Sequence, residues 1–279
     1  MNRLPIEKRV QIINLLVEGM SMRATSRIAD VSINTVTKLL VTVGTACAEF
    51  QDKTLRNLPC KRVEADEIWS FCYSKQKNIP DDKKGEFGFG DLWTWTAICA
   101  DSKLAVSWMV GARDYDTARD FMMDVGERLA NRVQLTTDGF KPYLSAVSEA
   151  FNNQVDYAQL VKIYGQPADS TDRRRYSPAE VSGTIIGKTI GKPDRALVST
   201  SYVERQNLTM RMHNRRFTRL TNGFSKKAEN HMHSVALYFM YYNFAKIHKT
   251  LRVTPAMEAG ISDHVWTIEE IVNLTSIDG

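Results

Sequence analysis

The sequence has few cysteines, and none of them has the spacing that holds zinc. The 279 residues include four, at Cys47, Cys60, Cys72 and Cys99. They are far apart, and no C-x-x-C pair occurs among them. This pattern favours reduced, buried thiols and argues against a zinc site.

Long apolar runs are also missing. No run approaches the ~20 residues of a membrane span. Residues 1–5 lack the apolar core of a signal peptide. Hydrophobic residues make up 43% of the chain and charged residues 25%, which is ordinary for a globular protein. We therefore expect a soluble cytoplasmic protein, without a membrane partner, built as one large domain or as a large and a small one.

The net charge of +5 is modest, but it is unevenly distributed. Residues 162–230 hold fourteen Lys or Arg against six Asp or Glu, a net charge of +8. Residues 101–161 hold six against nine, a net charge of −3. Such asymmetry indicates a nucleic-acid face in the later segment. A solvated charged surface is the alternative.

Residues 1–50 show the pattern of three helices. Apolar residues at helical spacing predict a first helix over 5–18, and Ser21 is the expected N-cap of a second helix over 21–29. Ser32 can cap a third helix that opens at Ile33. Its outer face carries residue types suited to a major groove, namely Asn34, Thr35, Thr37 and Lys38. The pattern is similar to a helix-turn-helix, and a plain helical subdomain is the alternative.

The stretch 62–71 (RVEADEIWSF) reads as a buried strand that carries acids at its centre. A buried carboxylate needs a partner, a proton or a metal. In a strand, Glu64 and Asp66 point to one face and Glu67 points to the other. An acid at the middle of such a strand makes sense where it holds a cation.

The following residues alternate between strand and helix patterns. Strands are predicted over 62–71, 92–99, 104–110, 132–137 and 154–164, and helices over 117–130 and 140–151. A helix then starts near Ser201, and another covers 226–248. The aromatic run 238–242 in that last helix is expected in the core. This order predicts an α/β fold with a ribonuclease-H-like mixed sheet flanked by helices.

We divide the chain into a helix-turn-helix domain (1–50), a linker (51–61), a catalytic domain (62–250) and a helical tail (251–279). Residues 165–198 interrupt the pattern with arginines and glycines. They predict a basic insertion with a hairpin before the last catalytic helix.

Three acids suit a metal centre: Asp66 in mid-strand, Asp138 at a strand end, and Glu204 in the first turn of a helix. Two-metal phosphodiester chemistry uses carboxylates that hold two divalent ions ~4 Å apart. Each acid has an alternative reading. Glu64 or Glu67 could replace Asp66 as the ligand, Asp138 could belong to a turn or cap a helix, and Glu204 could complement a helix dipole.

The motifs around these acids resemble the DDE transposases of bacterial insertion elements, above all the insertion-sequence-one group. The likeness rests on VEADEIW around Asp66, LTTDG around Asp138, and YVERQNLTMR, in which Arg211 follows Glu204 by two helical turns. It extends over residues 62–260. Two features depart from the group: the cysteine-rich zinc-binding segment of many members is absent, and 65 residues separate Asp138 from Glu204.

This resemblance implies a transposase that binds the ends of its element and uses Mg²⁺ or Mn²⁺, two ions, to free a 3′-hydroxyl and join it to target DNA. It implies double-stranded DNA as partner, a homodimer or larger assembly, and a place at the bacterial nucleoid. The expected DNA contacts outside the first domain are Arg173, Arg174, Arg175, Arg211 and Arg215. A silent DNA-binding repressor and a metal-dependent nuclease are the alternative functions.

Overall fold

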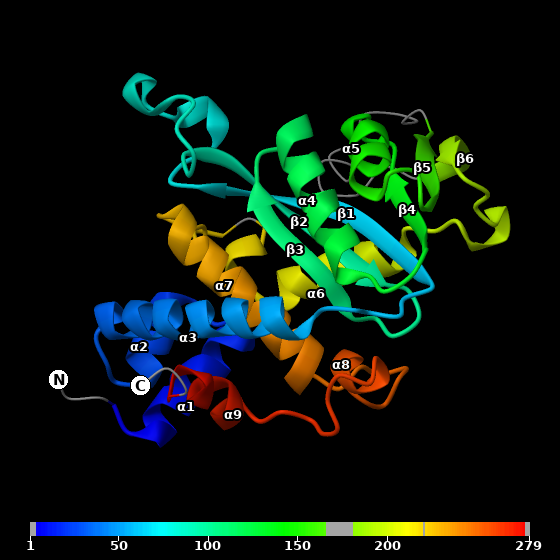
Figure 1. Ribbon diagram of the computed structural model, residues 1–279. Helices are drawn as coiled ribbons and strands as arrows, with labels where there is room; N and C mark the ends of the chain where they lie inside the picture. The colour runs from blue at the N-terminus through cyan, green and yellow to red at the C-terminus, as the bar shows by residue number, and fades with distance from the viewer. Residues whose placement is uncertain (1–3, 166–180, 220, 277–279) are drawn as a thin grey trace.

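The computed structural model describes residues 4–165, 181–219 and 221–276. Within them, a six-stranded mixed sheet forms the centre of the molecule (Figure 1). The strand order is β3-β2-β1-β4-β5-β6. β1 runs parallel to β4, and β4 to β5, whereas the other neighbouring pairs are antiparallel. The strands are β1 (Arg62–Cys72), β2 (Gly90–Cys99), β3 (Ala105–Gly111), β4 (Gln134–Asp138), β5 (Asp156–Tyr164) and β6 (Val181–Ile190).

Helices cover both faces of this sheet. On one face, α4 (Tyr115–Arg128) and α5 (Pro142–Phe151) pack through Phe121 and Tyr143 onto Trp95. On the other, α6 (Ser201–His213) and α7 (Ala228–Met240) share a buried cluster with Ile68 and Leu92. The predicted mixed sheet flanked by helices is confirmed.

The three predicted N-terminal helices are present as α1 (Ile6–Val17), α2 (Met22–Ile28) and α3 (Ile33–Thr54). Ser21 and Ser32 cap α2 and α3 as expected, since each hydroxyl accepts a backbone N–H. α3 extends through residues 51–54 of the predicted linker, and Leu55 and Leu58 beyond it are buried. The linker is therefore packed against the body of the protein.

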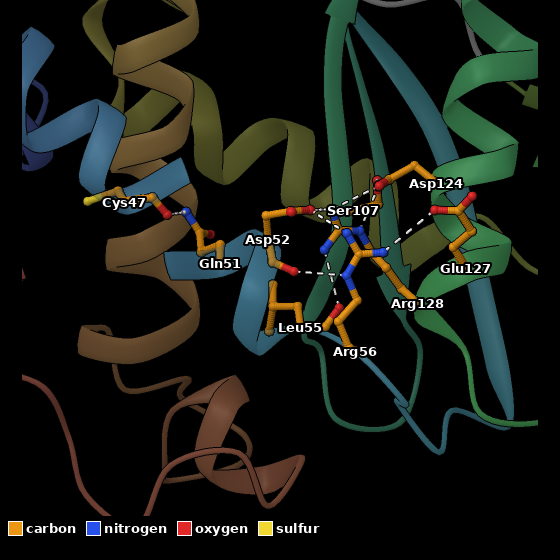
Figure 2. A network of polar contacts seen from close by, with 9 residues as sticks. All are labelled: Cys47, Gln51, Asp52, Leu55, Arg56, Ser107, Asp124, Glu127 and Arg128. Atoms are coloured by element: carbon orange, nitrogen blue, oxygen red, sulfur yellow. Dashed lines mark hydrogen bonds and ion pairs between the residues drawn. The ribbon is translucent and has the colours of Figure 1, made fainter. Parts of the chain in front are cut away.

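α3 joins these helices to the sheet domain along its whole length. It packs against α7 so closely that a Cβ on Gly44 would lie 2.6 Å from the His233 Cβ. At its far end, Arg128 of α4 donates to the Leu55 carbonyl and to a carboxylate oxygen of Asp52, at 3.2 and 2.8 Å (Figure 2). Asp124 of α4 completes the pairing of the Arg128 guanidinium. The helical N-terminal part and the sheet thus share one hydrophobic core.

The basic insertion differs from its prediction. Residues 181–190 form β6, which pairs antiparallel with β5 and widens the sheet. Its hairpin partner is therefore β5, the strand that precedes the insertion. Arg173, Arg174 and Arg175 lie outside the described residues.

The last part of the chain returns to the N-terminal helices (Figure 1). α7 continues into a π-helical turn, Tyr241–Ala245, in which Asn243 pairs with both backbone groups of Ala105 at the start of β3. The predicted burial of 238–242 is confirmed for Tyr238, Phe239, Met240 and Tyr242. Two short helices follow, α8 (Pro255–Glu258) and α9 (Ile268–Asn273). Of these, α9 packs against α1.

The four cysteines are buried and free, as predicted. In the described residues no single helix has the length and apolar composition to cross a membrane, although the bent pair α2–α3 meets both criteria together.

Candidate active site

Three carboxylates meet where β4 ends beside β1. The last β1–β4 pair is Ala65 with Thr137, and β4 stops at Asp138. β1 continues past this point, so its next residues, Asp66 and Glu67, lie beside the strand end. One oxygen from each of Asp66, Glu67 and Asp138 lies within 4.8 Å of the others. Two of the three predicted acids are therefore brought together.

The acids of β1 alternate between the two faces as predicted. Glu64 and Asp66 both contact α6, whereas Glu67 contacts Tyr143 of α5. Glu67 nevertheless belongs to the acidic cluster, because it lies just past the end of β4 and no strand separates it from Asp138.

Glu67 is held by partners on its own face. Its side chain is 1% exposed, and it accepts hydrogen bonds from Arg113 Nε at 2.5 Å and from the Tyr143 hydroxyl at 2.9 Å. Arg113 also lies 3.7 Å from an oxygen of Asp138 and packs over the Phe140 ring. Glu67 therefore fixes a guanidinium beside the cluster, and its oxygens are largely occupied.

Asp138 combines a turn contact with an accessible oxygen. Its Oδ1 accepts the backbone N–H of Phe140 at 3.0 Å, which closes a tight exit from β4. A Cβ on the adjacent Gly139 would lie 3.0 Å from Val161, a tight contact that glycine avoids. The side chain is 37% exposed, and its second oxygen lies 3.7 Å from Arg113, a distance that leaves it open to a ligand. Asp138 does not cap α5, whose N-cap is Lys141.

Asp66 is the most perturbed acid of the cluster. Burial, then the charges of Glu67 and Asp138 and, more weakly, Glu204, raise its pKa to about 8. Its Oδ2 accepts a hydrogen bond from Asn207 Nδ2 at 2.8 Å. An acid whose ionisation is opposed in this way favours a cation among the carboxylates.

Glu64 fastens α6 to the sheet. One of its oxygens accepts the backbone N–H groups of Tyr202 at 2.7 Å and Val203 at 3.1 Å. These are N–H groups of the first turn, which have no partner within a helix. Glu64 is thus used at a helix terminus, while Asp66, two residues on, faces the same helix.

Glu204 lies outside the close cluster. It accepts hydrogen bonds from the Thr200 hydroxyl at 2.6 Å and from the ammonium group of Lys162 on β5. Its side chain is 41% exposed. Its charge still contributes to the raised pKa of Asp66. The structure therefore places Glu204 near Asp66 but paired with a lysine.

The donor set fits a hard divalent cation. Asp66 and Asp138 offer carboxylate oxygens, the ligands that Mg²⁺ and Mn²⁺ prefer. In the described part of the chain, the buried Oδ1 of Asn207 has no hydrogen-bond partner, although the other end of that amide contacts Asp66. Asp66 and Asp138 could hold one ion directly, and Glu204 could join them if it left Lys162.

The predicted DNA contacts are spread over three places. Arg211 shares a face of α6 with Glu204 and Asn207 and lies close enough to Asp66 for its charge to be felt. Arg215 lines a cavity between α2 and α7. On α3, Asn34 and Lys38 are exposed, Thr35 bonds to Ser32, and the Thr37 hydroxyl donates to the Ile33 carbonyl.

Four side chains of this site were missed by sequence reasoning: Arg113, Tyr143, Lys162 and Asn207. A signal existed for Arg113, because it follows β3, which runs in the same direction as β1 and β4 and so ends at the same edge. For Tyr143 and Lys162, the contacts join residues 76 and 42 positions apart, and no local pattern marks them. Asn207 follows Glu204 by three positions and so shares its face of the helix, which was a usable signal.

No family model and no curated protein matches the chain. Among solved structures, the chain is similar to the Mos1 transposase paired-end complex with left transposon end, at 11% identity and a TM-score of 0.26. That match covers 56% of this chain and 60% of the Mos1 chain.

A second match is the piggyBac transposase synaptic complex with hairpin DNA. Its identity is 9% and its TM-score 0.39, and it covers 97% of this chain and 69% of the other. The Mos1 strand transfer complex matches with 11% identity and a TM-score of 0.25, over 86% of this chain and 76% of the other. Scores this low do not by themselves establish a shared fold.

Proposed function

We propose that this protein is a DDE-type DNA transposase that cuts the ends of its own element and joins them to target DNA. The observation that carries the proposal is the meeting of Asp66 and Asp138 at the end of β4, with Glu204 on a helix that Glu64 fastens to the same strand. In this proposal the sheet supplies two ligands, and α6 would supply the third once Glu204 leaves Lys162.

The chain's own residues prepare the site for phosphodiester chemistry. Divalent ions held there would activate the attacking oxygen and stabilise the leaving oxygen of an in-line displacement. Asn207 orients the carboxylate of Asp66, and the Asp138 turn fixes Oδ1, which leaves Oδ2 beside Arg113 for a ligand. Arg113, fixed by Glu67, places a positive charge where a phosphate oxygen would approach.

The N-terminal helices suit recognition of the element ends. α2 and α3 are bent by 112° across a four-residue turn, which lies within the range of helix-turn-helix units. Asn34 and Lys38 are exposed at the start of α3, where base edges would be contacted. Pairing of two ends during transposition implies a homodimer or larger assembly on DNA.

The test uses the DNA that flanks the coding sequence as a labelled duplex. Wild-type protein with MgCl₂ should cut one strand at the element end and leave a 3′-hydroxyl. Asp66→Asn, Asp138→Asn and Glu204→Gln should each abolish cutting, while end binding persists without metal. These substitutions keep the side-chain shape and remove a ligand charge.

Two controls sharpen this experiment. Glu258→Gln, an exposed acid on α8, should cut like wild type. A duplex of random sequence should be cut poorly, and equal cutting of both duplexes would favour a general nuclease. Full cutting by any of the three acid variants would remove that residue from the site.

A further inference from the structure

A cavity of about 730 Å³ lies between the N-terminal helices and the sheet domain, away from the acidic cluster. Its walls come from the end of α1, from α2, the start of α3 and α7, and from residues 213–216, 222–224 and 226 at and beyond the end of α6. The volume is in the range that holds a small ligand such as a nucleotide.

The lining is basic. No Asp or Glu is among the residues that form it. It includes five cationic side chains: Arg23, Arg27, Arg215, Arg216 and Lys226. Neutral donors, among them Ser21 and Asn230, complete the wall. In the described residues, none of the five cations has a carboxylate within ion-pair distance. A hollow with this charge attracts anions.

Arg216 is the clearest sign of a missing partner. It is partly buried, and desolvation lowers its pKa to about 10. Its Nη1 donates to the Ser225 hydroxyl at 2.8 Å, and Ser225 in turn contacts His231. Burial and then the charge of Arg216 lower the pKa of His231 to about 3, so the imidazole is neutral and adds no second positive charge beside Arg216. A partly buried cation that has only neutral partners favours an anion beside it.

We propose that this cavity binds a phosphate group, with Arg216 as its anchor. Arginine suits phosphate because its planar fork can donate two parallel hydrogen bonds to it. The phosphate could come from a DNA strand or from a free nucleotide, and the position of the cavity favours DNA. Arg23 and Arg27 lie on the helix that precedes the expected recognition helix, and Arg215 and Arg216 follow the helix that carries Glu204.

The spacing along α6 gives the position of this phosphate, and this step rests on the proposed function. From Glu204 to His213 the helix rises by about 14 Å, at ~1.5 Å per residue. That length corresponds to roughly four nucleotides of one DNA strand. If the strand runs parallel to α6, the cavity would hold it about four nucleotides from the bond to be cut.

The experiment measures DNA binding without metal, so that it does not depend on catalysis. Affinity for a random duplex of about 30 base pairs is followed over a salt series. Arg23→Gln/Arg27→Gln removes two exposed charges of the cavity, and Arg216→Gln removes the anchor. The control, Lys249→Gln/Arg252→Gln, removes two exposed charges from the loop before α8, and neither residue lines the cavity. A thermal melt compares sodium phosphate with sodium chloride at equal ionic strength.

We expect the Arg23/Arg27 variant to lose about 1.8 from the log–log salt slope, since each phosphate contact contributes ~0.9. The control should keep the wild-type slope. If DNA binding is unchanged but phosphate stabilises wild type and not Arg216→Gln, the phosphate group that the cavity binds comes from a free ligand and not from DNA. Unchanged slopes together with no phosphate effect would overturn the proposal, as would an equal loss in the control.

The Arg23/Arg27 pair is exposed, so it remains informative if Arg216→Gln fails to fold. Failure of the proposed function would appear separately, as a wild-type protein that binds DNA through the cavity but cuts no element end in MgCl₂.

Discussion

Asn207 donates a hydrogen bond from its Nδ2 to Oδ2 of Asp66 over 2.8 Å, across 141 residues of chain. This contact joins the helix that carries Glu204 to the strand that carries the first candidate ligand. The position of α6 on the sheet and the orientation of the Asp66 carboxylate are therefore coupled.

Asn207→Ala should weaken cation binding and slow DNA cutting by about tenfold or more. A hydrogen bond to a charged group contributes about 1.5–3 kcal/mol, and the carboxylate loses its orientation with it. Cutting rates measured over a MgCl₂ series check this. Leu208→Ala, an exposed neighbour on α6, is the control and should leave the rates unchanged. Equal rates for Asn207→Ala and wild type would show that Asp66 needs no such support.

The stability of the metal-free protein should fall as pH rises from about 5 to about 8. The pKa of Asp66 is 3.8 in a model compound and about 8 in the folded protein, so the folded state holds an extra proton between these values. Raising the pH removes that proton at a cost to the folded state. Thermal melts in EDTA across this range would show the decline.

Two companion melts identify the cause of that decline. Asp66→Asn should flatten it and, at pH 8, stabilise the metal-free protein by about 2 kcal/mol, or roughly 4–8 °C. MgCl₂ should reverse the decline in wild type only. A pH-independent wild-type melt would mean that Asp66 is not perturbed in this way.

Glu64→Ala should destabilise the protein by about 2 kcal/mol, because two backbone N–H groups of α6 would lose their acceptor. Glu64→Gln keeps an acceptor and should cost about half as much. Urea unfolding measures both values. The comparison is Glu229→Ala, which removes an exposed acid from the first turn of α7 and should have little effect.

Arg113→Met should lower the free energy of unfolding by about 3 kcal/mol. This is at the low end for breaking a buried ion pair, because Arg113 is itself partly exposed. The penalty comes from Glu67, which would remain buried without its cation. Adding Glu67→Gln should recover part of the loss in urea unfolding. Additive losses in the double variant would show that the two charges act independently.

Much of the fold was predictable because its signals are local. The apolar residues Val63, Ala65, Ile68 and Phe71 marked β1, and the serine caps marked α2 and α3. The position of Asp138 at a strand end was equally visible. These features depend on side-chain period and capping, which neighbouring residues determine.

What could not be predicted depends on distant parts of the chain. Residues 181–190 are rich in glycine and resembled an insertion, but β5 offers them a free edge to pair with. The ion pair of Glu204 with Lys162 links β5 to α6. Likewise, nothing near Glu64 indicated that it would cap a helix 138 positions later.

The continuous run of α3 has a consequence for any DNA the protein binds. Its 22 residues form a helix about 33 Å long. This helix packs closely against α7 at Gly44 and accepts a hydrogen bond from Arg128 through Asp52. The helices at the N-terminal end of α3 therefore cannot move independently of the sheet that carries the acidic cluster. If the protein cuts DNA as proposed, α3 fixes the distance between the bound DNA sequence and the cut. The cut would then fall a constant number of base pairs from that sequence.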